Sequence, residues 1–164
     1  MTDRKRIVIV PCSGIGKTYG SVCREAAYEV TEDMRPVETQ LVPLSLLVLG
    51  DEEVRAAVAH SAAVTIDGCK LACATKMVKE SGGTVAQDFA VLDVYRRNKQ
   101  FKPQGIAELN EGGQKLAHAL AEEIAGVVDG LALTAETAES AERPQEVSAA
   151  PSSFAVSDEG GAYA

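Results

Sequence analysis

The sequence predicts an α/β fold in three layers, with a mostly parallel sheet of about four strands and helices on both faces (flavodoxin- or Rossmann-like). Two observations predict it. Residues 7–10 are a continuous β-branched run, which is typical of a strand buried on both faces. Strand-like segments then alternate with segments of helical periodicity through the first 128 residues. Such alternation implies parallel strands joined by helical crossovers.

Each element has its own local signal. The predicted strands are residues 6–10, 38–42, 62–66 and 85–94, and the predicted helices are 19–34, 51–59, 69–80 and 111–128. The first helix carries one apolar stripe, and the second opens with acidic residues that suit its N-terminal dipole. Asp67-Gly68 ends the third strand, and Ser81-Gly82-Gly83 stops the helix that follows. Leu116, Leu120 and Ile124 share one face of the last helix.

Charge divides the chain into two parts, residues 1–128 and 129–164. The chain of 164 residues has a formal charge of −8. Residues 129–164 contribute seven acidic side chains and only Arg143 as a base, whereas residues 1–128 carry a net charge of −2. The second part is rich in Ala and Ser and has few large apolar side chains. We therefore predict an α/β domain over 1–128 and a disordered acidic tail over 129–164, with a transient helix over 132–142.

Composition excludes several classes of protein. The acidic charge and the 4% content of aromatic residues argue against nucleic-acid and anionic-membrane partners. No apolar run approaches the ~20 residues of a spanning helix or the length of a secretory signal. Four cysteines are too few for a disulfide scaffold. We therefore expect a cytoplasmic protein whose thiols are reduced or bound to metal.

The topology predicts where a site would form. With the strand order 2-1-3-4, the loops after the first and third strands face each other across a crevice at the carboxyl ends of the strands. Cys12 lies in the first of these loops and Cys69 at the start of the second. Cys69 and Cys73 would share one face at the N-terminus of the predicted helix 69–80, where the dipole favours thiolates. Three thiolates in this arrangement could bind zinc, and a disulfide four residues apart on a helix is geometrically poor.

The fourth cysteine and the two histidines contribute less to this prediction. Cys23 lies on the apolar stripe of the first helix, so it is either a packed core residue or a fourth ligand. If Cys23 is not a ligand, the metal would keep an open position. His60 precedes the third strand, at the opposite end of the sheet, and His118 lies on the polar face of the last helix. We expect neither histidine to bind the metal.

Two segments resemble a known family. Pro11-Cys12-Ser13-Gly14-Ile15-Gly16-Lys17 and Ile66-Asp67-Gly68-Cys69-Lys70-Leu71-Ala72-Cys73-Ala74 are similar to motifs of the DGC-domain family, and the resemblance covers about residues 6–125. The family takes its name from the central Asp-Gly-Cys. The resemblance implies zinc bound by four cysteines and implies no particular biochemical role. Cys12, Cys69 and Cys73 match its motifs well and Cys23 less closely, because some members carry a cysteine within the first loop, where this chain has Ile15 and Gly16.

The same residues also fit functions other than zinc binding. The same thiols could perform redox or transfer chemistry, with Cys69 as nucleophile and Cys12 or Cys73 as its partner, or hold an iron–sulfur cluster. Gly16-Lys17-Thr18 resembles the end of a phosphate-binding loop, but Pro11 stands where that motif requires glycine. Asp67 is predicted as an N-cap, or else as a base or a partner to a ligand. The basic run from Arg96 to Lys102 is predicted to be a solvated face.

Overall fold

The fold is built on a four-stranded parallel sheet. The structure, a computed structural model, describes residues 6–142, with side chains described up to residue 134. The strands are β1 (Ile7–Pro11), β2 (Thr39–Leu41), β3 (Ala62–Asp67) and β4 (Thr84–Ala90), and they lie in the order β2-β1-β3-β4. Ile9 of β1 pairs with Leu41 of β2 on one side and with Val64 of β3 on the other. The predicted fold class and strand order are confirmed.

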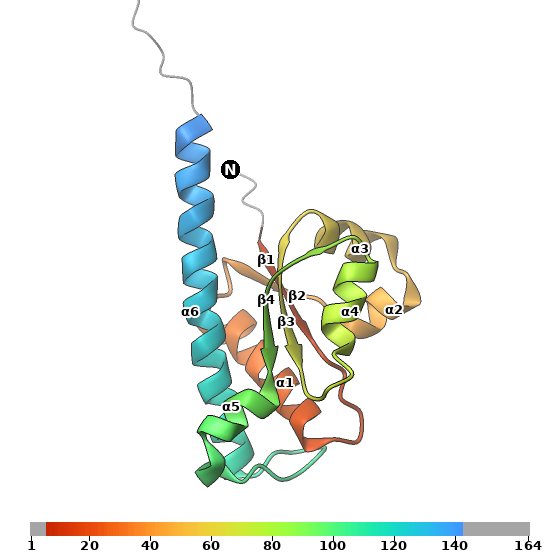
Figure 1. The fold of residues 1–164 in the computed structure, drawn as a ribbon, viewed down its shortest axis with the longest axis vertical. Helices are drawn as coiled ribbons and strands as arrows, with labels where there is room; N and C mark the ends of the chain where they lie inside the picture. The colour runs from red at the N-terminus through yellow and green to blue at the C-terminus, as the bar shows by residue number, and fades with distance from the viewer. Residues whose placement is uncertain (1–5, 143–164) are drawn as a thin grey trace, which may run out of the picture.

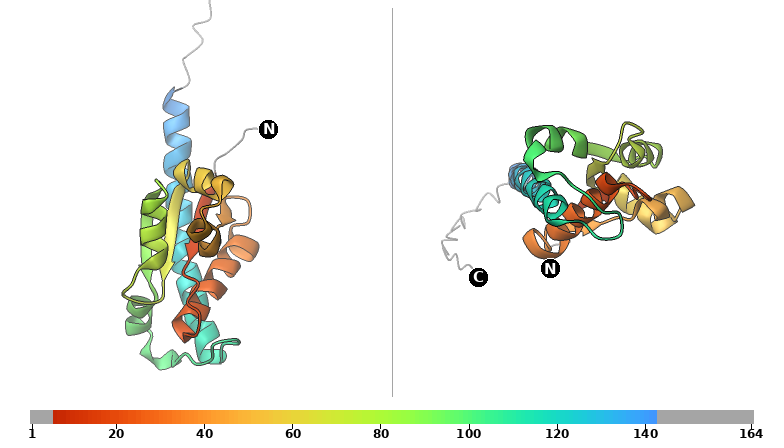
Figure 2. Two further views of the ribbon diagram at one scale, coloured as in Figure 1. Left: turned by 90° about the vertical axis from the view of Figure 1, so that its right-hand side faces the viewer. Right: turned by 90° about the horizontal axis from the view of Figure 1, so that it is seen from below.

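Helices cover both faces of the sheet (Figures 1 and 2). One face carries α1 (Thr18–Tyr28), α5 (Val91–Arg97) and α6 (Glu111–Glu142), and the other carries α2 (Leu44–Leu49), α3 (Glu52–Ala59) and α4 (Cys73–Glu80). Ile7 and Ile9 point into the first layer, whereas Val8 and Val10 point into the second. This alternation explains why the central strand is apolar throughout, since both of its faces are buried.

The carboxyl ends of all four strands share one edge, at the bottom of the sheet in Figure 1. We call it the carboxyl edge. Helices α1 and α4 begin there after β1 and β3, and α5 follows β4. Figure 1 also shows that α6 starts near this edge, runs back along the sheet and projects beyond the opposite end. Because helices start at the carboxyl edge, their free N–H groups gather there.

Three elements differ from the predicted ones, two of them at short helices that bury a single pair of apolar residues. The predicted strand 85–94 ends at Ala90, and α5 begins at Val91. Val91 and Val94 are both buried, three residues apart on one helical face. Leu44 and Leu47 have the same spacing and burial in α2, which was not predicted. The predicted helix 19–34 is α-helical only to Tyr28 and continues as the π-helix η1 (Glu29–Met34).

The last helix continues past the predicted domain boundary at residue 128, as far as Glu142. Val128 is fully buried and Leu131 packs on the same core cluster, so the helix still covers the sheet there. Arg35, at the end of η1, forms an ion pair with Asp129 at 2.6 Å. The remainder of the predicted tail, residues 143–164, lies outside the described residues. No helix within residues 6–142 is long and apolar enough to cross a membrane.

Candidate thiol site at the carboxyl edge

The loop after β1 is fixed against the first turns of α1. The Cys12 N–H donates to the Ile66 carbonyl of β3 at 2.8 Å, which ties the loop to the neighbouring strand. Gly14 has φ +52°, and a Cβ there would lie 2.1 Å from the Gly20 Cα. A Cβ on Gly20 would in turn lie 2.3 Å from the Gly14 carbonyl oxygen. Only two glycines allow this backbone contact, which holds Cys12 beside the start of α1.

Asp67, the last residue of β3, caps α4 from a distance. Its Oδ1 accepts the N–H of Ala74 at 2.9 Å, and its Oδ2 accepts the N–H of Thr75 at 3.1 Å and the Thr75 hydroxyl at 2.7 Å. The carboxylate is only 6% exposed, so these bonds offset its desolvation. Asp67 therefore caps a helix, as predicted. The N–H groups that it caps lie seven and eight residues further along the chain, and not in a helix that starts at Cys69.

The turn between β3 and α4 corrects the predicted helix 69–80. The helix starts only at Cys73, and Ala72 immediately before it has φ +51°, a left-handed conformation that non-glycine residues rarely adopt. Cys69 lies in this turn, where its carbonyl accepts the Ala72 N–H at 3.2 Å. The two cysteines therefore do not share a helical face, and the argument from their spacing of four was wrong. Asp67 decides the start of α4, since it satisfies the N–H groups of Ala74 and Thr75.

Gly68 allows the turn to approach α1. A Cβ at this position would lie 3.1–3.2 Å from backbone atoms of Tyr19 and Gly20. The loops after β1 and β3 thus meet over the first turn of α1, which confirms that they face each other. A third loop, residues 102–110, joins them through α1, because the Ser21 hydroxyl donates to the Ile106 carbonyl while Arg24 donates to the Ser21 hydroxyl at 3.0 Å and to the Ser13 carbonyl. No motif in the sequence indicated this third loop, whose contacts come from polar side chains on α1.

Three of the four thiols interact at the carboxyl edge. Burial raises the pKa of the Cys12 thiol; the N–H groups of Gly14 and Gly68, which bond its sulfur, act in the opposite direction, and the negative charges of Asp67 and Cys73 raise it further. Burial also raises the pKa of Cys23, which lies completely buried beside Cys12. Cys73 packs against the same core cluster and is half-buried. Cys23 therefore occupies a core position that also adjoins Cys12.

Cys69 lies in the turn before α4. It is half-buried there. Across residues 6–142, no group of three or more His, Cys, Asp or Glu side chains is placed to hold a metal ion. The predicted ligands Cys12, Cys69 and Cys73 thus lie on facing loops without forming a closed metal centre.

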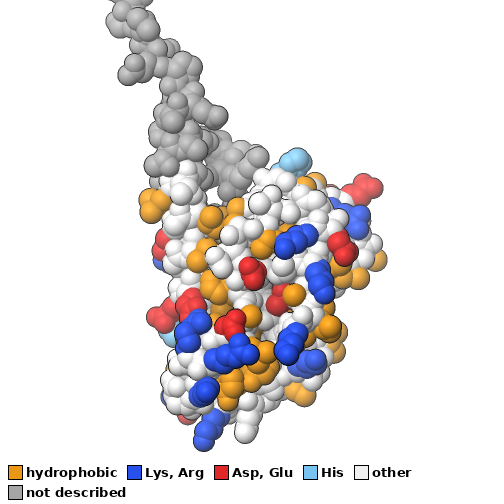
Figure 3. Space-filling view, in the orientation of Figure 1, with side chains coloured by type: hydrophobic (Ala, Val, Ile, Leu, Met, Phe, Trp, Pro, Cys, Tyr) orange, Lys and Arg blue, Asp and Glu red, His pale blue; other side chains and the backbone are white. Residues whose placement is uncertain are grey.

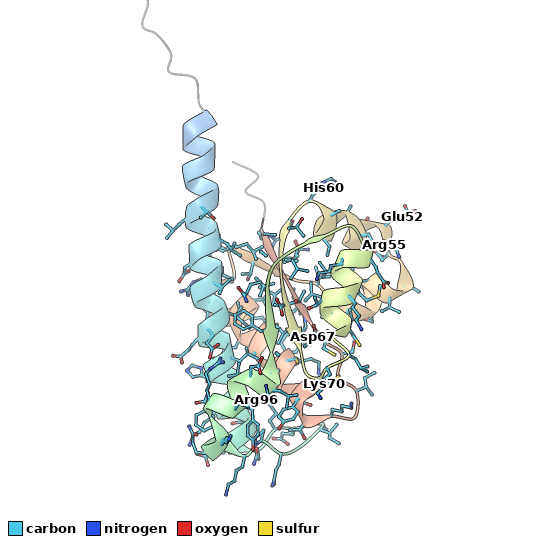
Figure 4. The ribbon with its side chains drawn as sticks, viewed as in Figure 1. Glu52, Arg55, His60, Asp67, Lys70 and Arg96 are labelled. Atoms are coloured by element: carbon cyan, nitrogen blue, oxygen red, sulfur yellow. The ribbon has the colours of Figure 1, made fainter. Side chains whose placement is uncertain are left out.

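The histidines lie away from the cysteines. His60 follows α3 at the opposite end of the sheet from Asp67 and Lys70 (Figure 4). His118 is exposed on α6 and contacts Glu29 of η1, which raises the pKa of the imidazole by hydrogen bonding and charge. Its partner Glu29 lines an open groove of about 610 Å³ between α1, η1 and α6. That groove contains no cysteine and is lined by Glu25, Tyr28, Glu29, Glu32, Asp33, Gln114 and Ala117.

The basic run that begins in the last turn of α5 is partly engaged in surface ion pairs. Arg96 pairs with Asp93, and Arg97 pairs with Glu123 of α6 at 2.7 Å. All four of these side chains are well exposed. Such pairs contribute little to stability, about 0–1 kcal/mol each, so the arginines form the solvated face that was predicted.

The fold and the site together define a class: a doubly wound α/β protein with thiols gathered where β1 and β3 end. Residues 8–111 match the DGC domain family, so the chain belongs to the DGC-domain family. The matched segment begins in β1 and ends at the start of α6, and it includes all four cysteines. No curated protein and no solved structure matches the chain.

Proposed function

We propose that the carboxyl edge binds one zinc ion through cysteine thiolates, with Cys12, Cys69 and Cys73 as ligands and Cys23 as a fourth. The observation that carries this proposal is the meeting of the β1 and β3 loops, which places Cys12 next to both Cys73 and Cys23. Thiolates are the ligands that zinc prefers in closed protein sites.

The donor groups fit a zinc ion chemically. The N–H groups of Gly14 and Gly68 already stabilise negative charge on the Cys12 sulfur. A bound zinc ion would supply the charge that deprotonates the remaining thiols and offsets the effect of burial on Cys12 and Cys23. Since no three candidate ligands are placed together within residues 6–142, we expect Cys69, which lies in the turn, to be the ligand that moves on metal binding. Its turn is joined to α4 through Ala72, whose left-handed conformation is the strained point of this segment.

Metal content is the direct test. The full-length protein, purified without added metal, should contain one zinc per chain, and the Cys69→Ser/Cys73→Ser variant should contain at most about a tenth of that. Ser13→Ala in the β1 loop is the matched control and should keep full zinc content. Cobalt substitution gives an independent readout, since thiolate-to-cobalt absorption reports sulfur ligands directly. Wild-type protein that contains no zinc, takes up no cobalt and has four freely titrating thiols would contradict the proposal.

Cys23 can be tested separately because its site tolerates a small apolar residue. Cys23→Ala should remain folded, since its neighbours Ala26 and Ala27 belong to the same buried cluster. As a fourth ligand, Cys23 should contribute at least about a tenfold increase in zinc affinity, measured by competition with a chelator. Unchanged affinity in Cys23→Ala would leave a three-cysteine site with an open position.

Thiol redox chemistry is a second candidate, and a specific observation favours it. Cys69 and Cys73 are only half-buried, and the buried Cys12 lies beside Cys73. An accessible thiol at the carboxyl edge therefore has a second thiol next to it with which it could form a disulfide. In this function two thiols lose two electrons and two protons to an external disulfide, such as oxidised glutathione, and form one internal disulfide. A reversible loss of two titrating thiols in the metal-free protein would support it, and a constant thiol count would exclude it.

A further inference from the structure

Three exposed aliphatic side chains surround the thiol site. Ile15 in the β1 loop is 90% exposed, Leu71 in the β3 turn 63%, and Ile106 in the loop 102–110 52%. The contacts of Ser21, Arg24 and Gly68 join these three loops into one surface. Each side chain comes from a different loop, yet all lie at the carboxyl edge. Exposed aliphatic groups concentrated around a site mark a surface that contacts another molecule.

The same surface is basic, although the chain as a whole is acidic. Lys17 and Lys70 are exposed beside Ile15 and Leu71, and within the described residues neither has a carboxylate partner. Glu108 is the exposed carboxylate of the three loops, since Asp67 is buried and fully bonded. Figure 3 shows basic and apolar side chains gathered over the lower half of the molecule, where this edge lies. We call Ile15, Lys17, Lys70, Leu71 and Ile106 the rim.

The chain contains a segment of complementary chemistry. Residues 154–159 read Phe-Ala-Val-Ser-Asp-Glu, in which two apolar side chains precede two adjacent carboxylates. Phe154 and Val156 would meet the aliphatic groups of the rim, and Asp158 and Glu159 would meet its lysines. Because residues 129–164 carry most of the negative charge of the chain, attraction to the rim would steer their approach.

The course of α6 favours a second copy as the owner of the rim. Helix α6 starts near the carboxyl edge and carries the chain over 32 residues to the opposite end of the molecule (Figure 1). The residues that follow α6 therefore leave their own copy at the end opposite the rim, where the rim of a second copy can meet them. We propose that residues 154–159 of one copy bind the rim of a second copy, so that the acidic segment covers the thiol site of its neighbour.

Charge exchange between two full-length variants tests this proposal. Lys17→Glu/Lys70→Glu and Asp158→Lys/Glu159→Lys should each weaken the self-association of the wild type at least tenfold, measured by analytical ultracentrifugation. An equimolar mixture of the two should recover association, because the reversed rim of one variant meets the reversed segment of the other. Binding within one copy would give no recovery on mixing, and that result would overturn the proposal.

The apolar half of the contact needs its own variants. Ile15→Ser/Leu71→Ser should weaken association at least tenfold, whereas Val37→Ser/Val48→Ser, at exposed valines outside the rim, should leave it unchanged. A labelled peptide of residues 150–164 should bind the wild type and not the rim variant, and should protect Cys69 from alkylation. A protein that stays monomeric at all concentrations and binds no peptide would overturn the proposal. Zinc content, measured on the same samples, reports the proposed metal site independently of this result.

Discussion

The two loops that form the thiol site differ in how they are held. The loop after β1 lies with its backbone directly against α1, and Gly14 and Gly20 leave no room for a side chain between them. The turn after β3 is anchored by Asp67, whose carboxylate accepts the N–H groups of Ala74 and Thr75, and by Gly68, which lies against α1. Between Gly68 and α4, Cys69 is half-buried, Leu71 is exposed and Ala72 has a left-handed backbone conformation. One side of the site is therefore packed backbone against backbone, whereas the other carries exposed and strained residues. If the proposed site binds a metal ion, we expect the β3 turn rather than the β1 loop to adjust.

The largest effect should come from filling the contact between the β1 loop and α1. Gly14→Ala places a Cβ against the Gly20 backbone at a positive φ and should lower the free energy of unfolding by about 4 kcal/mol in urea titrations. Gly16→Ala is the matched control, since Gly16 has φ +76° but no atom near its Cβ position. It should cost only about 1–2 kcal/mol. Equal losses at the two positions would mean that the loop is not fixed by backbone contact.

Removal of the distant cap should have the next largest effect. Asp67→Ala leaves the N–H groups of Ala74 and Thr75 without their acceptor and should cost about 2–3 kcal/mol. Asp51→Ala provides the comparison, since Asp51 caps α3 with a single bond to Val54 at 3.0 Å and should cost about 1 kcal/mol. Hydrogen exchange should show that Asp67→Ala loses amide protection at the first turn of α4. Protection there that equals the wild type would refute the capping role.

The accessible and buried thiols should react at different rates. In metal-free protein at pH 8, Cys69 and Cys73 should be modified at least about ten times faster than Cys12 and Cys23, as mapped by mass spectrometry. Because the pKa of both buried thiols is raised, less of each is thiolate at pH 8 than in an ordinary cysteine. Their rates should therefore keep rising as the pH is raised to 9.5. In urea all four should react alike, and a native protein with four equal rates would contradict the structure.

The smallest effect should come from relieving strain in the β3 turn. Ala72→Gly removes the Cβ at φ +51° and should raise the free energy of unfolding by about 1 kcal/mol or less, because glycine also has more freedom to lose on folding. Ala74→Gly, just inside α4, should have the opposite sign. Destabilisation by Ala72→Gly would show that the turn is not strained, and would remove the contrast between the two loops.

The sequence by itself determined the parallel sheet, its strand order and the edge at which the cysteines gather. These features follow from local patterns. Alternating strands and helices form a parallel sheet covered on both faces, and a β-branched run such as 7–10 is typical of a strand inside such a sheet. It also determined that Cys12 and the Asp67-Gly68-Cys69 turn face each other, because parallel strands end at one edge.

Only the tertiary structure decided how the thiols relate to one another. Asp67 bonds to residues seven and eight positions away, so α4 starts at Cys73 and leaves Cys69 in the turn. The contact between Gly14 and Gly20 fixes Cys12 beside Cys23, and packing of Leu131 extends α6 past residue 128. In each case a contact between distant residues outweighs the local preference of the segment, and local periodicity contains no information about such contacts.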